Sequence, residues 1–244
     1  MFSLPIQQFL KVKNYPYFSP KAIFFDMDGV LFDSMPYHAT AWVKAMNETG
    51  IPFTTHEAYM NEGRTGDSTI DGAFGRTLGR EATAEEKKQI YSLKSKYFVA
   101  ESKTTPMPFA SEMLEHLKMT GMQIFLVTGS GQPSLLDSLQ TFFPGIFARK
   151  KMITAFDVSN GKPHPEPYLT ALKKSGVHPW EVVVIENAPL GIESAKAAGL
   201  FTIALNTGPL DKDVLVAAGA DVVLDSMHDL LLQWNEFRKC FTEN

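Results

Sequence analysis

The sequence has little cysteine, no excess of positive charge and no long apolar run, and each shortage excludes a class of protein. Its one cysteine, Cys240, rules out a framework of internal disulfides, so a reducing cytoplasm is the expected location. Lysine and arginine number 23 against 27 acidic residues, so no basic surface for nucleic acid is expected. The apolar runs are too short to cross a membrane.

The first residues also lack something. Residues 1–5 have neither the basic start nor the long apolar core of a secretory signal. We therefore expect this end of the chain to be an extension that leads to the first strand and is partly mobile.

The pattern of apolar residues predicts an α/β protein. The apolar residues 23–25 stop at Asp26-Met27-Asp28-Gly29, as a buried strand of a parallel sheet does where it meets a turn. After about residue 106, strand and helix patterns alternate, which predicts a doubly wound, Rossmann-like parallel sheet covered on both faces. The later predicted strands are Met122–Thr128, Lys151–Thr154, Glu181–Ile185, Phe201–Ala204 and Asp221–Leu224.

Between the first strand and this alternation, the pattern is helical. Residues 37–46 and 85–99 carry apolar side chains at helical spacing, and no convincing strand separates them. We therefore expect a core domain made of residues 1–35 and 106–244, with a small all-helical cap domain of residues 36–105 inserted after the first strand.

Polar residues stand where predicted strands end, and a lysine stands in a nearby loop. In chain order they are Asp26 and Asp28, Thr128-Gly129-Ser130, Lys162, and Glu186-Asn187. Each alone has an ordinary explanation, such as a turn with solvated acids, a calcium loop or a rigid surface loop. Because ligands of open parallel sheets bind outside the carboxyl ends of the strands, the whole set is expected to line one crevice. Such a set favours a metal-and-phosphate site.

These segments, in this order and spacing, resemble the four signature motifs of the haloacid dehalogenase superfamily. The similarity runs from about Lys21 to Asp225 and is closest to the β-phosphoglucomutase-like group, to which the stretch Asp33–His38 and Trp42 are also similar. Within that group, residues 61–66 and 185–191 resemble a branch that includes inorganic pyrophosphatases.

The resemblance implies phosphoryl transfer through an aspartyl phosphate. It makes Asp26 the nucleophile and Asp28 the general acid and base, a residue that dehalogenases of the superfamily lack because a halide leaving group needs no proton. Thr128, with the amides of Gly129 and Ser130, is expected to hold phosphate oxygens. The positive charge that balances them is expected from Lys162.

The resemblance also implies Mg²⁺ as the cofactor, held by hard oxygen ligands. The expected ligands are Asp26, the backbone carbonyl of Asp28, Glu186 and Asn187. Many relatives have an aspartate where this chain has Asn187, so the predicted site carries one less negative charge. Whether Asn187 binds the ion directly or through water stays open at this point.

Three residues of the predicted cap are candidates for substrate binding. Arg64 suits a forked contact to a second phosphate or a carboxylate. Glu62, if it faces the crevice, suits a metal ion or a sugar hydroxyl, because a carboxylate repels a bare phosphoryl group. His38 is a candidate for positioning Asp28 or the substrate. The alternatives are a surface Glu62–Arg64 pair and a solvated histidine at a helix start.

Three functions remain open. The first is a Mg²⁺-dependent phosphohydrolase acting on a small phosphate, with inorganic pyrophosphate ahead of sugar phosphates. The second is a β-phosphoglucomutase, although Gly131-Gln132 stands where mutases of the group carry lysine and asparagine. The third is a non-catalytic sensor of phosphorylated metabolites, which both aspartates argue against. The expected partner is a small phosphorylated substrate, with no nucleic acid or membrane, and the chain is expected to be a monomer or a weak oligomer.

Overall fold

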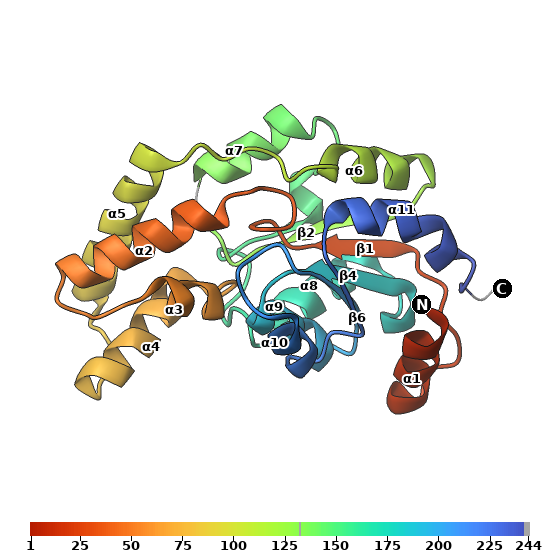
Figure 1. The fold of residues 1–244 in the computed structure, drawn as a ribbon, viewed down its shortest axis with the longest axis horizontal. Helices are drawn as coiled ribbons and strands as arrows, with labels where there is room; N and C mark the ends of the chain where they lie inside the picture. Colours follow the sequence, from red (N-terminus) through yellow and green to blue (C-terminus); the bar gives the residue numbers. More distant parts are fainter. Residues whose placement is uncertain (132, 242–244) are drawn as a thin grey trace.

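The computed structural model describes residues 1–131 and 133–241 as an α/β protein built on one parallel sheet (Figure 1). The strand order is β3-β2-β1-β4-β5-β6, and every neighbouring pair is parallel. The strands are β1 (Ala22–Phe25), β2 (Gln123–Val127), β3 (Met152–Ile153), β4 (Val182–Glu186), β5 (Phe201–Leu205) and β6 (Val222–Leu224). The predicted fold class is confirmed, and β2 to β6 each lie within one residue of their predicted bounds.

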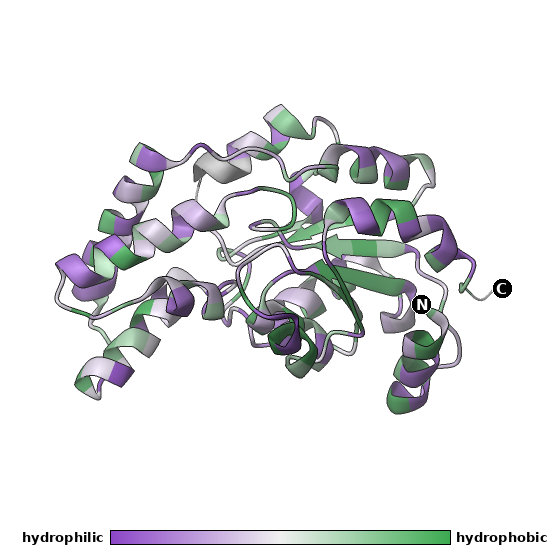
Figure 2. Ribbon diagram, in the orientation of Figure 1, coloured by the Kyte–Doolittle hydropathy of each residue, from purple (hydrophilic) through white to green (hydrophobic). Residues whose placement is uncertain are grey.

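Helices cover both faces of the sheet. The helices α6, α7 and α11 lie on one face and α8, α9 and α10 on the other (Figure 1). Their bounds are α6 (Ala110–Met119), α7 (Pro133–Phe142), α8 (Glu166–Ser175), α9 (Pro189–Ala197), α10 (Lys212–Ala217) and α11 (Met227–Arg238). The strands are largely hydrophobic, whereas the covering helices alternate between polar and apolar residues (Figure 2). Within the described part of the chain, no helix is long and apolar enough to span a bilayer.

The central strand β1 is buried on both sides. Ile23 and Phe25 face the core shared with α6, α7 and α11, while Ala22 and Phe24 face the core shared with α8 and α9. Strand β1 pairs with β2 on one side and β4 on the other, and the strand order reverses there. Ligands of open α/β sheets bind at such a switch point. Asp26, the residue directly after β1, therefore lies where a ligand is expected to bind.

Four helices separate β1 from α6 and lie together to one side of the sheet (Figure 1). They are α2 (Met35–Glu48), α3 (Thr55–Met60), α4 (Gly66–Leu78) and α5 (Ala84–Glu101). Capping boxes at Thr54 and Thr83 start α3 and α5, which satisfies amide donors that the first helical turn leaves unpaired. This helical insertion has a hydrophobic cluster of its own, formed mainly by α2, α3, α4 and α5.

The expectation of a mobile amino-terminal extension is wrong. Helix α1 (Ser3–Lys13) packs against the core, and Phe2, Ile6 and Phe9 are at most 4 % exposed. These three residues are spaced at about one helical turn and so form one apolar stripe. The ring of Phe9 contacts the rings of Phe18 and Phe201 edge-on. This apolar stripe packs α1 against the core, and the prediction of a mobile segment did not take it into account.

Candidate active site

The carboxyl ends of β1, β2 and β4 meet around the ammonium group of Lys162, which is fully buried. Its Nζ lies 2.6 Å from Asp26 Oδ1 and 2.6 Å from Glu186 Oε1. It also donates to the backbone carbonyl of Val127 at 3.0 Å. The structure therefore brings together residues that lie up to 160 positions apart, counted from Asp26 to Glu186. A lysine between two carboxylates joins the loop before α8 to two neighbouring strands.

Protein donors engage both oxygens of Glu186. Tyr168, a residue missed in the sequence, donates its hydroxyl to Oε1 at 2.7 Å. The backbone amides of Asn187 and Ala188 donate to Oε2 at 3.0 and 3.3 Å. Four donors thus hold the Glu186 carboxylate in place, Lys162 among them. Its predicted role as a metal ligand stays a prediction, because a cation would have to share these oxygens.

Asp28 has a separate set of partners. Its Oδ1 accepts hydrogen bonds from Ser34 Oγ at 2.5 Å and His38 Nε2 at 3.1 Å. Burial is the largest influence on the pKa of Asp28 and raises it, but His38, Ser34 and Lys94 together outweigh burial and leave the pKa lowered. The Asp28 carboxylate is therefore stabilised in its ionised form. His38 lies in the first turn of α2, and it is buried, so the alternative of a solvated histidine is wrong.

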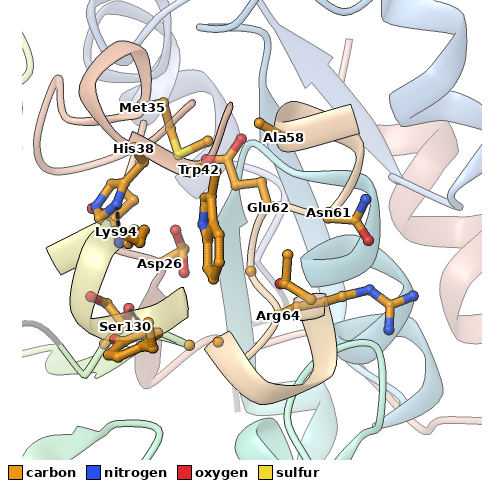
Figure 3. A pocket seen from close by; sticks show the side chains of 17 residues that line it. Asp26, Met35, His38, Trp42, Ala58, Asn61, Glu62, Arg64, Lys94 and Ser130 are labelled. Carbon is orange, nitrogen blue, oxygen red and sulfur yellow. Dashed lines mark hydrogen bonds and ion pairs between the residues drawn. The ribbon is translucent and has the colours of Figure 1, made fainter. Parts of the chain in front are cut away.

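Behind His38 lies Lys94, a buried lysine that the sequence analysis missed. Its Nζ lies 2.8 Å from His38 Nδ1, and a dashed line marks this contact in Figure 3. Because an ammonium group only donates, Nδ1 accepts, and His38 is the neutral tautomer that donates from Nε2 to Asp28. The signal was present in the sequence: Lys94 lies four residues from both Ile90 and Phe98, in the middle of the buried face of α5.

Three aromatic rings surround the ammonium of Lys94. Its Nζ lies 5.4 Å from the ring centroid of Trp42, 5.8 Å from that of Tyr91 and 5.1 Å from that of Phe98. Burial lowers the pKa of Lys94 to about 8. The rings stabilise a cation through their negative faces but do not replace water, so this lysine titrates close to neutral pH.

The surroundings of Asp26 favour its neutral form, whereas those of Asp28 favour the ionised form. Burial raises the pKa of Asp26 to about 8, Lys162 opposes the rise, and the charges of Glu186 and Asp28 add to it. A carboxylate in this position therefore gains from a further positive charge beside it.

Glu62 belongs to the same buried group of acids. It lies in the loop between α3 and α4, is 7 % exposed, and accepts a hydrogen bond from Asn187 Nδ2 at 2.7 Å. The alternative of a surface Glu62–Arg64 pair is therefore wrong. Burial raises the pKa of Glu62 well above its usual range, the bond from Asn187 opposes this, and the charges of Asp26, Glu186 and Asp28 add to it.

The residues present fit a hard divalent cation. Asn187 Oδ1 is buried, and no hydrogen-bond partner for it exists among the described residues. An amide oxygen without a donor, next to a group of buried carboxylates, is suited to Mg²⁺, which takes few carboxylates and other hard oxygens. In residues 1–131 and 133–241, no three His, Cys, Asp or Glu side chains form a metal-binding group. The predicted Mg²⁺ ligands are of a different kind, because they include the side-chain amide of Asn187 and the backbone carbonyl of Asp28.

Two other residues predicted to bind substrate have hydrogen-bond partners within the chain. The guanidinium of Arg64 points away from Asp26 and donates to Ser68 Oγ at 3.0 Å (Figure 3). The amide of Ser130 donates to Thr128 Oγ1 at 2.9 Å. It therefore points at the Thr128 hydroxyl, and the two groups were expected to hold phosphate oxygens together. The proposed ligand-binding roles of both stay predictions. Gln132, which stands where mutases of the group carry another residue, lies outside the described residues.

The cavity above Asp26 is small because the helical insertion presses on the sheet. A Cβ atom on Gly129 would lie 2.2 Å from the carbonyl oxygen of Gly63, so only glycine permits this approach. The cavity has a volume of about 60 Å³. It is lined by Asp26, Asp28, His38, Glu62, Lys94 and Thr128 among others (Figure 3). This inner cavity suits a compact, charged ligand.

Comparisons with known proteins agree with this geometry. The sequence model of one family, the haloacid dehalogenase-like hydrolases, matches residues 20–199. A solved structure from Bacteroides vulgatus, provisionally described as a beta-phosphoglucomutase, is 49 % identical with a TM-score of 0.96 and covers 99 % of this chain and 98 % of its own.

Two curated relatives carry different activities. A beta-phosphoglucomutase of Bacillus subtilis (strain 168) is 28 % identical over 89 % of this chain and 97 % of its own length. A hexitol phosphatase A of Escherichia coli (strain K12) is 30 % identical over 86 % of this chain and 93 % of its own length. A mutase and a phosphatase are thus about equally similar to the chain, and the choice between them depends on the site.

Proposed function

Because this chain belongs to the haloacid dehalogenase-like hydrolase family, and to its β-phosphoglucomutase-like group of phosphatases and phosphomutases, we propose that it is a Mg²⁺-dependent phosphohydrolase. It works through a phosphoaspartate on Asp26. Its substrate is a compact phosphate, with inorganic pyrophosphate ahead of sugar phosphates.

The position of Glu62 carries the choice of substrate. This carboxylate lies in the inner cavity with Asp26 and Asp28, and it bonds to Asn187 rather than to solvent. Burial and the neighbouring acids raise the pKa of Glu62, so this group ionises readily only beside a positive charge, and the ligand that suits this cavity arrives with a cation. A compact, highly charged anion that binds together with a divalent cation, such as pyrophosphate, meets that requirement.

In the first step, an oxygen of Asp26 attacks phosphorus and the bond from phosphorus to the leaving oxygen breaks. Lys162, 2.6 Å from Asp26, holds the nucleophile in place and supplies positive charge beside the phosphoryl oxygens. The protonated form of Asp28, which is the minor form because its pKa is lowered, donates a proton to the leaving oxygen. In the second step, Asp28 takes a proton from water, which attacks the phosphoaspartate and releases phosphate.

The environment of Asp28 also supports pyrophosphate. Because the pKa of Asp28 is lowered by His38, Ser34 and Lys94, little of this residue carries a proton near neutral pH, so few protons are available for a leaving group. The leaving group of pyrophosphate is phosphate, which needs little protonation, whereas a sugar alkoxide needs a full proton. Lys94 acts here through His38 and is a positioning residue for Asp28.

Mg²⁺, when bound, would supply charge stabilisation for the transferring group, and Asp26, the carbonyl of Asp28, Asn187 and Glu186 are the residues that would hold it.

A steady-state comparison of substrates tests the proposal. Phosphate release is measured with pyrophosphate, β-glucose 1-phosphate and a panel of sugar phosphates, in the presence of Mg²⁺. We expect kcat/KM for pyrophosphate to exceed that for each sugar phosphate by about tenfold or more. A higher kcat/KM for any sugar phosphate would reverse the ranking, and absence of release from every substrate would reject a phosphohydrolase.

A β-phosphoglucomutase remains the second candidate, because several of the similar proteins carry that description. The same reactions decide it when glucose 6-phosphate is measured alongside phosphate. Formation of glucose 6-phosphate faster than phosphate would favour the mutase.

A further inference from the structure

A second cavity adjoins the inner cavity and is several times larger. Its volume is about 370 Å³, and it is lined by residues of α4, α5 and two loops of the sheet domain. Gly66, Tyr91 and Gly129 line both cavities, so the two spaces meet at these residues. We call this second space the outer cavity.

The ring of Tyr91 lies at the junction. A Cβ atom on Gly66 would lie 2.4 Å from the Tyr91 ring carbons Cδ2 and Cε2, so the ring rests directly on the backbone of α4. The centroid of the Trp42 ring lies 6.2 Å from that of Tyr91, and the Lys94 ammonium lies 5.8 Å from the Tyr91 centroid. These contacts hold the ring at the boundary of the two cavities.

The two cavities differ in chemistry. The inner cavity is lined by the acids Asp26, Asp28 and Glu62 and by Lys94. Among the described residues that line the outer one there is no lysine, arginine or histidine, but there are the side chains of Thr65, Asp67 and Ser159. The ring of Phe156, 75 % exposed, also borders it. Hydroxyls, one carboxylate and an open aromatic face suit an uncharged polyol and give a second phosphate no cation.

We propose that Tyr91 is the specificity-determining residue of this enzyme, an inference that rests on the proposed function. Its ring separates the space for the phosphoryl group from a space that fits the carbon skeleton of a sugar. With the ring in place, the leaving group must fit within the inner cavity. Without it, the leaving group of a sugar phosphate extends into the outer cavity.

The test compares Tyr91→Ala and Tyr91→Phe with the wild type. For each protein, kcat/KM is measured with β-glucose 1-phosphate and with pyrophosphate, and the ratio of the two is taken. Both values come from one preparation, so the ratio does not depend on how much of the protein is folded. Tyr91→Ala is expected to raise the ratio by about tenfold or more, and Tyr91→Phe, which keeps the ring, by less than about threefold.

The matched control is Leu93→Ala, which shortens a half-buried side chain on the same helix that lines neither cavity. It should leave the ratio unchanged. An unchanged ratio in Tyr91→Ala, or an equal rise in Leu93→Ala, would overturn the role of Tyr91.

Binding separates this inference from the proposed function. In an Asp26→Asn background, calorimetry compares the affinity for β-glucose 1-phosphate with that for inorganic phosphate. Adding Tyr91→Ala should favour the sugar phosphate by about tenfold, and no change would again overturn the inference. A wild type that hydrolyses none of the phosphates defeats the proposed function, whereas the binding ratio still decides on Tyr91.

Discussion

At the scale of single residues, the site combines two aspartates whose surroundings shift their pKa values in opposite directions. Asp26 lies among carboxylates with one lysine, and its pKa is raised to about 8. Asp28 accepts two hydrogen bonds, lies near Lys94, and has a lowered pKa. A nucleophile acts in its ionised form, so the raised pKa of Asp26 calls for a further positive charge beside it, which bound Mg²⁺ would supply.

Asp26→Asn should lower kcat by more than about a thousandfold, because an amide cannot form the phosphoaspartate. The fold should persist, since the amide keeps the size of the carboxyl group. Phosphate release measures activity, and circular dichroism and thermal unfolding measure the fold. Substantial residual turnover by a correctly folded variant would remove the covalent mechanism.

Glu62→Gln should reduce kcat/KM for pyrophosphate by about 10- to 100-fold and that for a simple aryl phosphate by much less. The reason is that the charge of Glu62 suits a ligand that arrives with a cation. The exposed Glu85→Gln on α5 serves as the matched control and should change neither rate. Equal losses on both substrates in Glu62→Gln would show that the residue is structural.

Lys94 should make stability depend on pH. Its pKa in the folded protein is about 8 against the usual 10.5, so the unfolded chain binds more protons between these values. At about 1.4 kcal/mol for each unit of pKa, the cost of the buried charge is about 3 kcal/mol below pH 8. It should fade as the pH rises from about 8 to 10.5.

Lys94→Met removes this charge. The free energy of unfolding of the wild type, relative to that of Lys94→Met, should therefore rise by about 3 kcal/mol across this window. Urea titrations at several pH values measure the difference. A difference that does not change with pH would contradict the assigned pKa.

At the scale of elements, α1 shows how a segment outside the sheet joins the core. Phe2, Ile6 and Phe9 form its buried stripe, while Leu4 on the opposite side is 62 % exposed. The helix lies far from the site in Figure 1, beyond the other end of the sheet. It should therefore contribute to stability and not to catalysis.

Phe9→Ala should lower the free energy of unfolding by about 3–5 kcal/mol, because it leaves a cavity among the rings of Phe18 and Phe201. Leu4→Ala should change it by less than about 0.5 kcal/mol. Chemical denaturation measures both variants, and kcat/KM should stay within about twofold of the wild type in each. An equal effect of the two variants would mean that α1 is not docked in solution.

At the scale of the whole molecule, the site exists only where the helical insertion meets the sheet. Glu62, Lys94 and His38 come from the insertion, whereas Asp26, Lys162 and Asn187 come from the sheet domain. The proposed division into a core of residues 1–35 and 106–244 and a cap of residues 36–105 stays a prediction. A cation shared by groups from both parts would tie them together.

Removal of divalent metal by EDTA should therefore stop catalysis, and added Mg²⁺ should restore it. Mg²⁺ should also raise the temperature of thermal unfolding, because a cation that binds the folded protein stabilises it. Asn187→Ala should reduce that rise. Activity that survives chelation would rule out the proposed cofactor.

The sequence by itself determined the sheet, the order of its elements and the polar residues at the ends of its strands. Apolar runs that stop at polar residues are local patterns, and in a parallel sheet their ends must meet at one edge. This is why the positions of Asp26, Thr128 and Glu186 could be predicted from local patterns.

Only the tertiary structure decided which side chains face the crevice from the helical insertion. It buried Glu62 against Asn187, turned Arg64 away, and placed Lys94 behind His38. Those contacts join segments whose relative position depends on packing between the insertion and the sheet, which no local pattern encodes. The same packing set the small volume of the inner cavity and placed the ring of Tyr91 at its border.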